Sequence, residues 1–408
     1  MKRLFTVAVV GSLSSALLAG AAEAKPGTFA LVKTFKLAGD ETVTAAIAPT
    51  RRSAFVFGMR ERRAGLEPLA FRWNGRTWSR SPLPGGLTGI PGQADASSAK
   101  NVWMSVTGSE RLAEKYLDNL PEDGCAAPQR SAGPRTAPAA ARAGSNASKV
   151  LRWNGKRWTV ARTFKNAYVN AVAALGPKNV WVYGLDRKGP ASWHFDGRTW
   201  KRHATGFLIQ KAEAVSGREI WALAHDRSLH NGYSGIIARF DGTRWTRVQP
   251  DVLRTDPAPT KTSPGYSATI LDLNVLGRDR VWVSAITTEG ALCGANVHAS
   301  VQLRWNGRTW ASEAPAVTSG FILSDHVSDG SGGLYAQGWG SDSGDEWDFD
   351  RAFFHRTPKG VWTRRILPER RMIQHLVHIP GTKSLWAAGT RETSGGGIDV
   401  AVWSLGRP

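Results

Sequence analysis

The chain has 408 residues, of which 41% are hydrophobic and 21% charged, with 53 Lys and Arg against 33 Asp and Glu. The net charge of +20 and the isoelectric point near 10.4 predict attraction to polyanions such as nucleic acid, teichoic-type polymers or anionic lipid headgroups. Beyond the N-terminal residues no segment approaches the roughly eighteen apolar residues that a spanning helix needs, which excludes further transmembrane helices.

The N-terminus has the three regions of a secretory signal peptide. Met1-Lys2-Arg3 is charged, Leu4 to Leu18 is apolar, and Ala22-Glu23-Ala24 supplies the small residues of a cleavage site. Residue 21 is Ala where a lipoprotein signal would place Cys, so lipid anchoring is not supported. We therefore expect residues 1–24 to be a signal peptide and the mature protein to be secreted, extracellular and without a membrane span. The alternative is an uncleaved N-terminal anchor.

A strand-like run from Thr28 to Phe35 precedes a set of repeats. The repeats are marked by Arg-Trp-Asn-Gly-Arg-Thr-Trp at 72–78 and 304–310, with degenerate copies at 153–158, 195–200 and 240–245. Asn-Gly or Asp-Gly between aromatic and β-branched runs predicts a hairpin tip, because both positions tolerate φ > 0. A loop of two or of four residues puts the flanking pair, such as Trp73 and Trp78, on one face of the sheet.

A second recurring motif lies upstream of these tips and ends in Trp at positions 103, 181, 221, 282 and 386. Another apolar run precedes each copy of this motif. Each unit therefore contains four predicted strands. Trp158, Trp200 and Trp245 are 42 and 45 residues apart, within the roughly 40 to 50 residues expected of a four-stranded propeller blade. Continuous β-branched and aromatic runs argue against a helical solenoid.

The strand count predicts how the ring closes. Third strands lie near Phe71, Leu151, Trp193, Ala238, Leu303, Phe354 and Val402, and fourth strands near Trp78, Trp158, Trp200, Trp245, Trp310 and Trp362. The simplest closure pairs Phe29–Phe35 with the last blade, built from 375–379, 385–388 and 400–404, and so removes the open edges. We predict an all-β fold, a seven-bladed β-propeller of four-stranded antiparallel blades over residues 25–408, closed by its N-terminal strand.

The excess of Trp residues has two explanations. Sixteen of the eighteen Trp fall in repeat positions, where large aromatic side chains would fill the gaps between blades. The alternative is an exposed platform on which sugars stack. Packing is the favoured interpretation because the positions follow the repeat.

The repeats resemble those of secreted bacterial β-propellers of the kelch-like and sialidase-repeat-like group, over nearly the whole mature chain. The resemblance implies the fold alone. Kelch repeats carry a Gly pair after the second strand, whereas single residues such as Gly58, Gly184 and Gly389 occur here. The sialidase Asp-box places Asp and Gly two apart, whereas Asn74 and Gly75 are adjacent. Neither family's active site is therefore carried over.

Blades 2, 4, 5 and 6 carry long connections between their second and third strands, which emerge on one face of the ring, and such loops commonly bind ligands. The longest spans 109–148, with helical spacing over 109–120 and a Pro-, Ala- and Arg-rich part over 126–144 that is typical of disorder. Cys125 lies in this insertion and Cys293 in that of blade 5. In an exported chain we expect them to form a disulfide. The alternatives are two unpaired thiols or an intermolecular bridge.

The blade 6 insertion holds the one dense acidic cluster, composed of Asp342, Asp345, Glu346, Asp348 and Asp350. Calcium binds several carboxylate oxygens, so the last four are candidate metal ligands. Their spacing matches no EF-hand loop. A solvated acidic turn, or an acidic turn that pairs with Arg, is therefore favoured over a calcium site. No cofactor is expected. Basic clusters at 60–63 and 364–371 are interpreted as solvated surface because no exposed aromatic residues are interleaved with them.

The innermost strands offer Glu213, Asp272, Asn274 and Asp325 as polar groups that line the channel. Such groups commonly bind water, and a carboxylate pair for glycoside chemistry is the alternative. His375 and His378 lie three apart on a strand, so they point to opposite faces. Histidines at 225, 230 and 298 lie in loops and could meet at one face. We expect them to be solvated side chains and not metal ligands.

Two functions remain. The first is an exported, monomeric, non-catalytic scaffold that binds a cell-envelope polymer, glycan or protein through the insertion-bearing face. The second is a glycan-active hydrolase or lyase with acidic residues at the channel mouth. Because no nucleophile elbow, zinc-binding HExxH motif or phosphate loop occurs in the sequence, the first is favoured.

Overall fold

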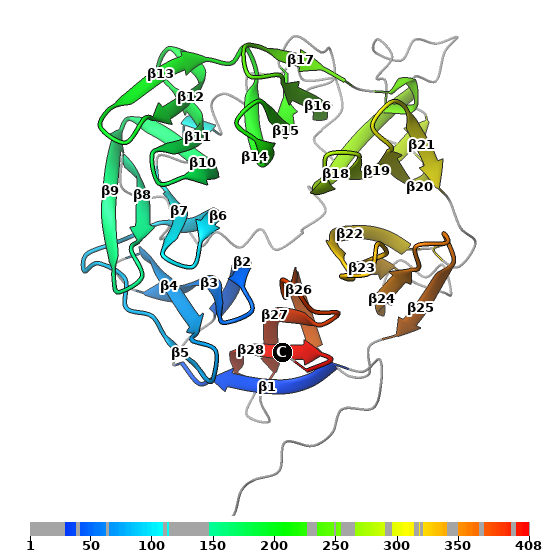
Figure 1. Ribbon diagram of the computed structural model, residues 1–408, viewed down its shortest axis with the longest axis horizontal. Helices are drawn as coiled ribbons and strands as arrows, with labels where there is room; N and C mark the ends of the chain where they lie inside the picture. Colours follow the sequence, from blue (N-terminus) through cyan, green and yellow to red (C-terminus); the bar gives the residue numbers. More distant parts are fainter. Residues whose placement is uncertain are drawn as a thin grey trace, which may run out of the picture.

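The computed structural model describes residues 29–37, 41–62, 65–108, 112–113, 147–226, 235–248, 250–253, 266–289, 296–313, 318, 321–340, 350–366, 371–392 and 397–407. They form seven antiparallel sheets of four strands each, arranged as blades around a central axis (Figure 1). The predicted seven-bladed propeller is confirmed. The blades are numbered 1 to 7 in chain order from residue 41.

The strands of blades 1 to 6 follow one another outward from the axis in sequence order. Blade 1 contains β2 (Glu41–Thr50), β3 (Ser53–Arg62), β4 (Gly65–Trp73) and β5 (Trp78–Arg80); blade 2 contains β6 (Ile90–Ser98), β7 (Asn101–Thr107), β8 (Ala147–Trp153) and β9 (Trp158–Lys165). Blade 3 contains β10 (Ala167–Gly176), β11 (Asn179–Asp186), β12 (Gly189–Phe195) and β13 (Trp200–Ala204); blade 4 contains β14 (Leu208–Ser216), β15 (Glu219–His225), β16 (Gly235–Phe240) and β17 (Trp245–Arg247).

Blade 5 contains β18 (Tyr266–Gly277), β19 (Arg280–Glu289), β20 (Asn296–Trp305) and β21 (Trp310–Glu313); blade 6 contains β22 (Phe321–Ser328), β23 (Leu334–Gly340), β24 (Asp350–Arg356) and β25 (Trp362–Ile366). A short 3₁₀ helix, η2 (Asp251–Leu253), lies between blades 4 and 5. No helix in the described ranges is long and apolar enough to cross a membrane.

Blade 7 is built from both ends of the chain. It contains β26 (Arg371–His378), β27 (Leu385–Glu392), β28 (Ile398–Leu405) and, at its outer edge, β1 (Phe29–Phe35). The register runs from Phe29 opposite Leu405 to Phe35 opposite Val400, and Figure 1 shows β1 lying across the last blade. The predicted closure by the N-terminal strand is confirmed.

The hairpin tips of blades 1 to 5 contain four residues, and their geometry corrects one detail of the prediction. Trp73 pairs with Trp78, and of the loop residues only Gly75 has a positive φ, 94°. Asn74 stays at negative φ and instead accepts hydrogen bonds on Oδ1 from the amides of Arg76 and Thr77, both at 2.9 Å. The equivalent Asn or Asp does the same in blades 2 to 5. Asn and Asp are therefore selected here as side-chain acceptors that stiffen the loop.

The aromatic residues fill the gaps between blades, as the packing interpretation predicts. Trp386 of blade 7 contacts both Trp73 and Trp78 of blade 1, with ring centroids 5.2 and 5.3 Å apart. Trp221 of blade 4 lies in the same way against the tip pair of blade 5, at 5.7 and 5.9 Å. The aromatic residue of the second strand of one blade thus packs on the aromatic pair at the tip of the next blade. This contact explains why the second-strand motif and the tip motif recur together.

Candidate functional site

Every inner strand contains a β-bulge near its middle, where extra residues interrupt the pairing with the second strand. The bulged residues, termed the bulge ring, are Thr44, Gly92 with Gln93, Asn170, Gln210, Leu271, Asp325 with His326, and Gln374. A bulge re-aims the side chain of the extra residue. All members of the bulge ring line one axial cavity of about 1280 Å³.

The cavity extends toward the insertion-bearing face. Thr107 and His225, which end the second strands of blades 2 and 4, lie on its wall. Ala113, from the blade 2 insertion, is buried on the same wall. Leu112 and Ala113 are helical, and because the other residues of 109–120 lie outside the described ranges, the helix expected there stays a prediction.

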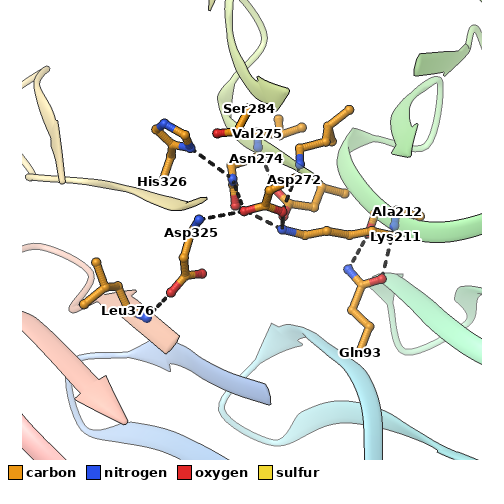
Figure 2. Close-up of polar contacts among 12 residues, drawn as sticks. Gln93, Lys211, Ala212, Asp272, Asn274, Val275, Ser284, Asp325, His326 and Leu376 are labelled. Atoms are coloured by element: carbon orange, nitrogen blue, oxygen red, sulfur yellow. Dashed lines mark hydrogen bonds and ion pairs between the residues drawn. The ribbon is translucent and has the colours of Figure 1, made fainter. Parts of the chain in front are cut away.

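Amide side chains of the bulge ring bind the backbone of other blades. Gln93 of blade 2 reaches blade 4, where its Nε2 donates to the Ala212 carbonyl at 2.6 Å and its Oε1 accepts from the Ala212 amide at 3.1 Å (Figure 2). Asn170 donates to the Gln210 carbonyl at 2.8 Å. Gln374 accepts from the Val43 amide at 3.2 Å, which joins blade 7 to blade 1. These bonds hold the wall of the cavity in one arrangement.

Lys211 is the centre of the polar network on the other side of the cavity. Its Nζ lies 2.8 Å from Asp272 Oδ1 and 3.0 Å from Asn274 Oδ1 (Figure 2). It also lies 3.1 Å from Glu213 Oε1. Glu213 also accepts from the Val275 amide at 2.6 Å. One ammonium group of blade 4 therefore binds an acceptor of its own strand and two acceptors of blade 5.

The charged groups in this network shift one another's pKa values. Burial alone would lower the pKa of Lys211, but the carboxylates of Asp272 and Glu213 outweigh it, and the pKa is raised. Burial alone would raise the pKa of Asp272, but the Lys211 ammonium and donated hydrogen bonds outweigh it, and the pKa is lowered. This ion pair is therefore maintained at neutral pH.

Asp325 differs from Asp272 in its environment. Its Oδ2 accepts from the Leu376 amide of blade 7 and from Gln337 Nε2, and its own amide donates to Asp272 Oδ2 at 2.7 Å. Its backbone is left-handed, with φ 54°, which Asp tolerates better than most residues. Burial raises the pKa of Asp325 to about 7, and the nearby Asp272 carboxylate acts in the same direction.

Two histidines of the cavity are held neutral. Burial lowers the pKa of His326 and of His375 to about 4 in each case. His326 stacks on Trp282, with ring centroids 5.7 Å apart, and its Nδ1 lies 3.4 Å from Asn274 Nδ2. Within the described residues no group of three or more His, Cys, Asp or Glu has the arrangement of a metal site.

The structure brings the four predicted polar residues together. Glu213, Asp272, Asn274 and Asp325 all lie on the cavity wall. The sequence reasoning missed Lys211 and the amides of the bulge ring. The single glycines of the repeats were a signal for the bulges. They lie within the second strands and not after them, where the sequence pattern had placed them. A Cβ at Gly58, Gly184 or Gly389 would meet the carbonyl oxygen just before the bulge, at 2.5, 1.8 and 1.9 Å.

Several predicted groups lie outside the described residues. These are the signal peptide 1–24, Cys125, Cys293, Asp342, Asp345, Glu346 and Asp348. Asp350 begins β24, but its side chain lies outside the described part, as does that of His298. The disulfide and the calcium ligands therefore stay predictions.

Comparison with known proteins supports the propeller fold but does not identify a sequence family. No protein-family description matches the chain, and no curated protein is found as a relative. Among solved structures, YCF48 bound to D1 peptide is similar over 90% of this chain and 95% of that chain, at 10% identity and a TM-score of 0.53. YCF48 from Cyanidioschyzon merolae is similar over 91% and 98%, at 12% identity and a TM-score of 0.50.

A third similar structure is the extracellular domain of a hybrid two-component system from B. thetaiotaomicron, at 12% identity and a TM-score of 0.51. The match covers 92% of this chain and 40% of that one. At these identities the likeness shows a shared propeller fold only.

Proposed function

We propose that the protein is an exported, non-catalytic scaffold that binds a segment of a cell-envelope polymer, glycan or protein, taken into the axial cavity from the insertion-bearing face. The observation that carries the proposal is the bulge ring, which places amide, hydroxyl and carboxylate side chains around one cavity of about 1280 Å³. This volume exceeds the roughly 300 to 1,000 Å³ of small-molecule pockets, which favours a polymer segment.

The wall of the cavity is preorganised for binding. Gln93, Asn170 and Gln374 are held by bonds to the backbone of other blades. A ligand therefore does not have to order these side chains, which reduces the entropic cost of association. Amides donate and accept at once, so they suit sugar hydroxyls and peptide groups.

The charged residues of the cavity limit which kinds of ligand it can bind. Lys211 faces Glu213 and Asp272, and Asp325 lies next to them. The cavity is thus acidic within a strongly basic chain, and it favours a segment rich in hydrogen-bond donors or amino groups over an anionic one. Since a propeller of the same fold is known bound to a peptide, peptides belong among the ligands to test.

The test is a retention assay with the mature chain, residues 25–408, on a panel of envelope glycans, amino-sugar polymers and peptides. Leu271 is a half-buried member of the bulge ring without a polar role, so Leu271→Trp should fill the cavity and raise Kd by about tenfold or more. Val160→Trp, on the exposed outer strand β9, is the matched control and should bind as the parent does. Equal binding by the two variants, or retention on no member of the panel, would refute the proposal.

One observation favours a second candidate, a glycan-active hydrolase or lyase. Burial raises the pKa of Asp325 to about 7, while the Lys211 ammonium helps to lower that of neighbouring Asp272, and such a separation is typical of an acid and base pair. The backbone amides and the lysine that bind both carboxylates favour a structural role. If ligands in the panel are cleaved and Asp325→Asn abolishes cleavage while it preserves binding, the second candidate is correct.

Export is tested separately. We expect N-terminal sequencing of protein from the culture medium to begin at Lys25, because the small-residue site ends at Ala24. Accumulation of the full chain in the cell would contradict this.

A further inference from the structure

The face opposite the insertions has its own regular construction. Because neighbouring strands in a blade are antiparallel, the turn between the first and second strands lies at the same end as the tip between the third and fourth. The contacts agree, since a Cβ on tip Gly75 would meet Arg52 of the inner turn at 3.2 Å, and one on Gly155 would meet Lys100 at 2.9 Å. The surface made of these inner turns and tips is termed the hairpin face.

The tips carry exposed cations around the ring. Blades 1 to 5 present Arg76, Lys156, Arg157, Arg198, Arg244 and Arg308, all exposed, immediately after the tip glycine or one residue later. The Asn or Asp at the start of each tip binds the loop amides, which fixes the backbone that bears these cations. The tips of successive blades thus form a rigid, repeated display.

The inner turns add a second set of cations closer to the axis. Arg52, Lys100, Lys178 and Arg218 are exposed in blades 1 to 4, and each lies beneath the tip glycine of its own blade. Blade 6 contributes exposed Lys359 at its tip. Positive charge is therefore present at two radii of the hairpin face.

Acidic residues neutralise only part of this charge. In the described turns and tips of the hairpin face, the exposed carboxylates are those of Asp196, Asp241 and Asp279. Asp241 lies 3.8 Å from Arg244, and Arg278 beside Asp279 is paired with buried Glu219 at 3.1 Å. Arg198 shares its tip with Asp196, and the remaining cations of blades 1 to 4 have no acidic residue in their own turn or tip.

We propose that the hairpin face docks on a bilayer surface rich in anionic phospholipid headgroups. The cations on the hairpin ends of blades 1 to 6 can meet a plane simultaneously, whereas a linear polyanion would contact only one sector of the ring. Each Lys or Arg near an anionic bilayer strengthens binding, and salt screens this attraction. The docked protein would present its insertion-bearing face, and the mouth of the axial cavity, away from the membrane.

The experiment is vesicle co-sedimentation of the mature chain. Vesicles of equal parts phosphatidylglycerol and phosphatidylcholine are compared with pure phosphatidylcholine, at low and at physiological salt. A tip variant combines Arg76→Ser, Arg157→Ser, Arg198→Ser and Arg308→Ser. A control variant removes the same charge from the other parts of the surface through Lys165→Ser, Arg187→Ser, Lys188→Ser and Arg391→Ser, all at exposed positions.

We expect binding to the anionic vesicles alone, weakened by salt, and reduced by about tenfold or more in the tip variant but less than threefold in the control. Equal losses in both variants would overturn the proposal, because binding would then follow net charge and not the hairpin face. Binding to soluble polyphosphate that depends on the tips, without binding to vesicles, would overturn it in favour of a linear polyanion. Circular dichroism of both variants confirms that they are folded.

Discussion

Truncation of the two phenylalanines at the ends of β1 should open the ring. Phe29 contacts Phe353 of blade 6, with ring centroids 4.8 Å apart, and Phe35 stacks on Phe71 of blade 1 at 4.1 Å. Each side chain is 8% exposed. The closing strand therefore anchors blade 7 to both of its neighbours, one Phe at each end.

The size of the effect follows from burial. Replacement of a buried Phe by Ala costs about 3 to 5 kcal/mol. The two side chains lie about 20 Å apart along a strand of seven residues, so their effects should add. The double variant Phe29→Ala/Phe35→Ala should lose about 6 kcal/mol or more, which is comparable with the whole stability of an ordinary domain.

The assay is urea unfolding of the mature chain, followed by Trp fluorescence. Leu31→Ala is the matched control, because Leu31 lies in the same strand but is 44% exposed; its free energy of unfolding should change by less than about 0.5 kcal/mol. If each single Phe variant unfolds within about 0.5 kcal/mol of Leu31→Ala, the closing strand does not hold the ring and the reasoning fails.

Three further predictions concern the cavity and the insertions. Since the folded pKa of Asp325 is about 7, above the unfolded value near 3.9, its ionisation should cost stability progressively as pH rises from about 4 to 7. Asp325→Asn should therefore match the parent at pH 4 and be about 2 to 4 kcal/mol more stable at pH 8 by thermal and urea unfolding; equal stability at both pH values would contradict the shift. Gly184→Ala should destabilise by about 1 to 3 kcal/mol, because the added Cβ would lie 1.8 Å from the Tyr168 carbonyl, whereas Gly176→Ala in the same blade meets nothing within 4 Å and serves as control. Cys125 and Cys293 should give no free thiol in unreduced, denatured mature protein; two reactive thiols per chain would exclude the bridge, and a dimer that reductant separates would show that it forms between chains.

The architecture could be predicted from the sequence because it depends on repetition. The aromatic pairs of the tips and the Trp of the second strands recur at blade spacing, and the count of third and fourth strands left only Phe29–Phe35 to complete blade 7. The four polar residues chosen on the inner strands do line the cavity, because the inner strands are the ones that surround the axis.

Apart from Asp325, the bulge ring was not predicted, because a bulge shifts the alternation of side chains along a strand. Gln210 and Asn170 each occupy an extra position in a strand, so a strict period of two assigns their neighbours to the wrong face. Lys211 was missed for a related reason. A lysine on an inner strand is not expected to be buried unless partners supply compensating charge, and Asp272, on another blade, is far from it in sequence.

The pairing of Phe29 with Leu405, 376 positions later, also has a consequence for the order of folding. A chain delivered from its N-terminus produces β1 first, yet β1 has no partner strand until β28 exists. Blades 1 to 6 can each form from local contacts, but the final blade requires the slowest kind of contact, between segments of very high sequence separation. Until that step β1 stays an unpaired apolar strand, the kind of segment that chaperones protect from aggregation.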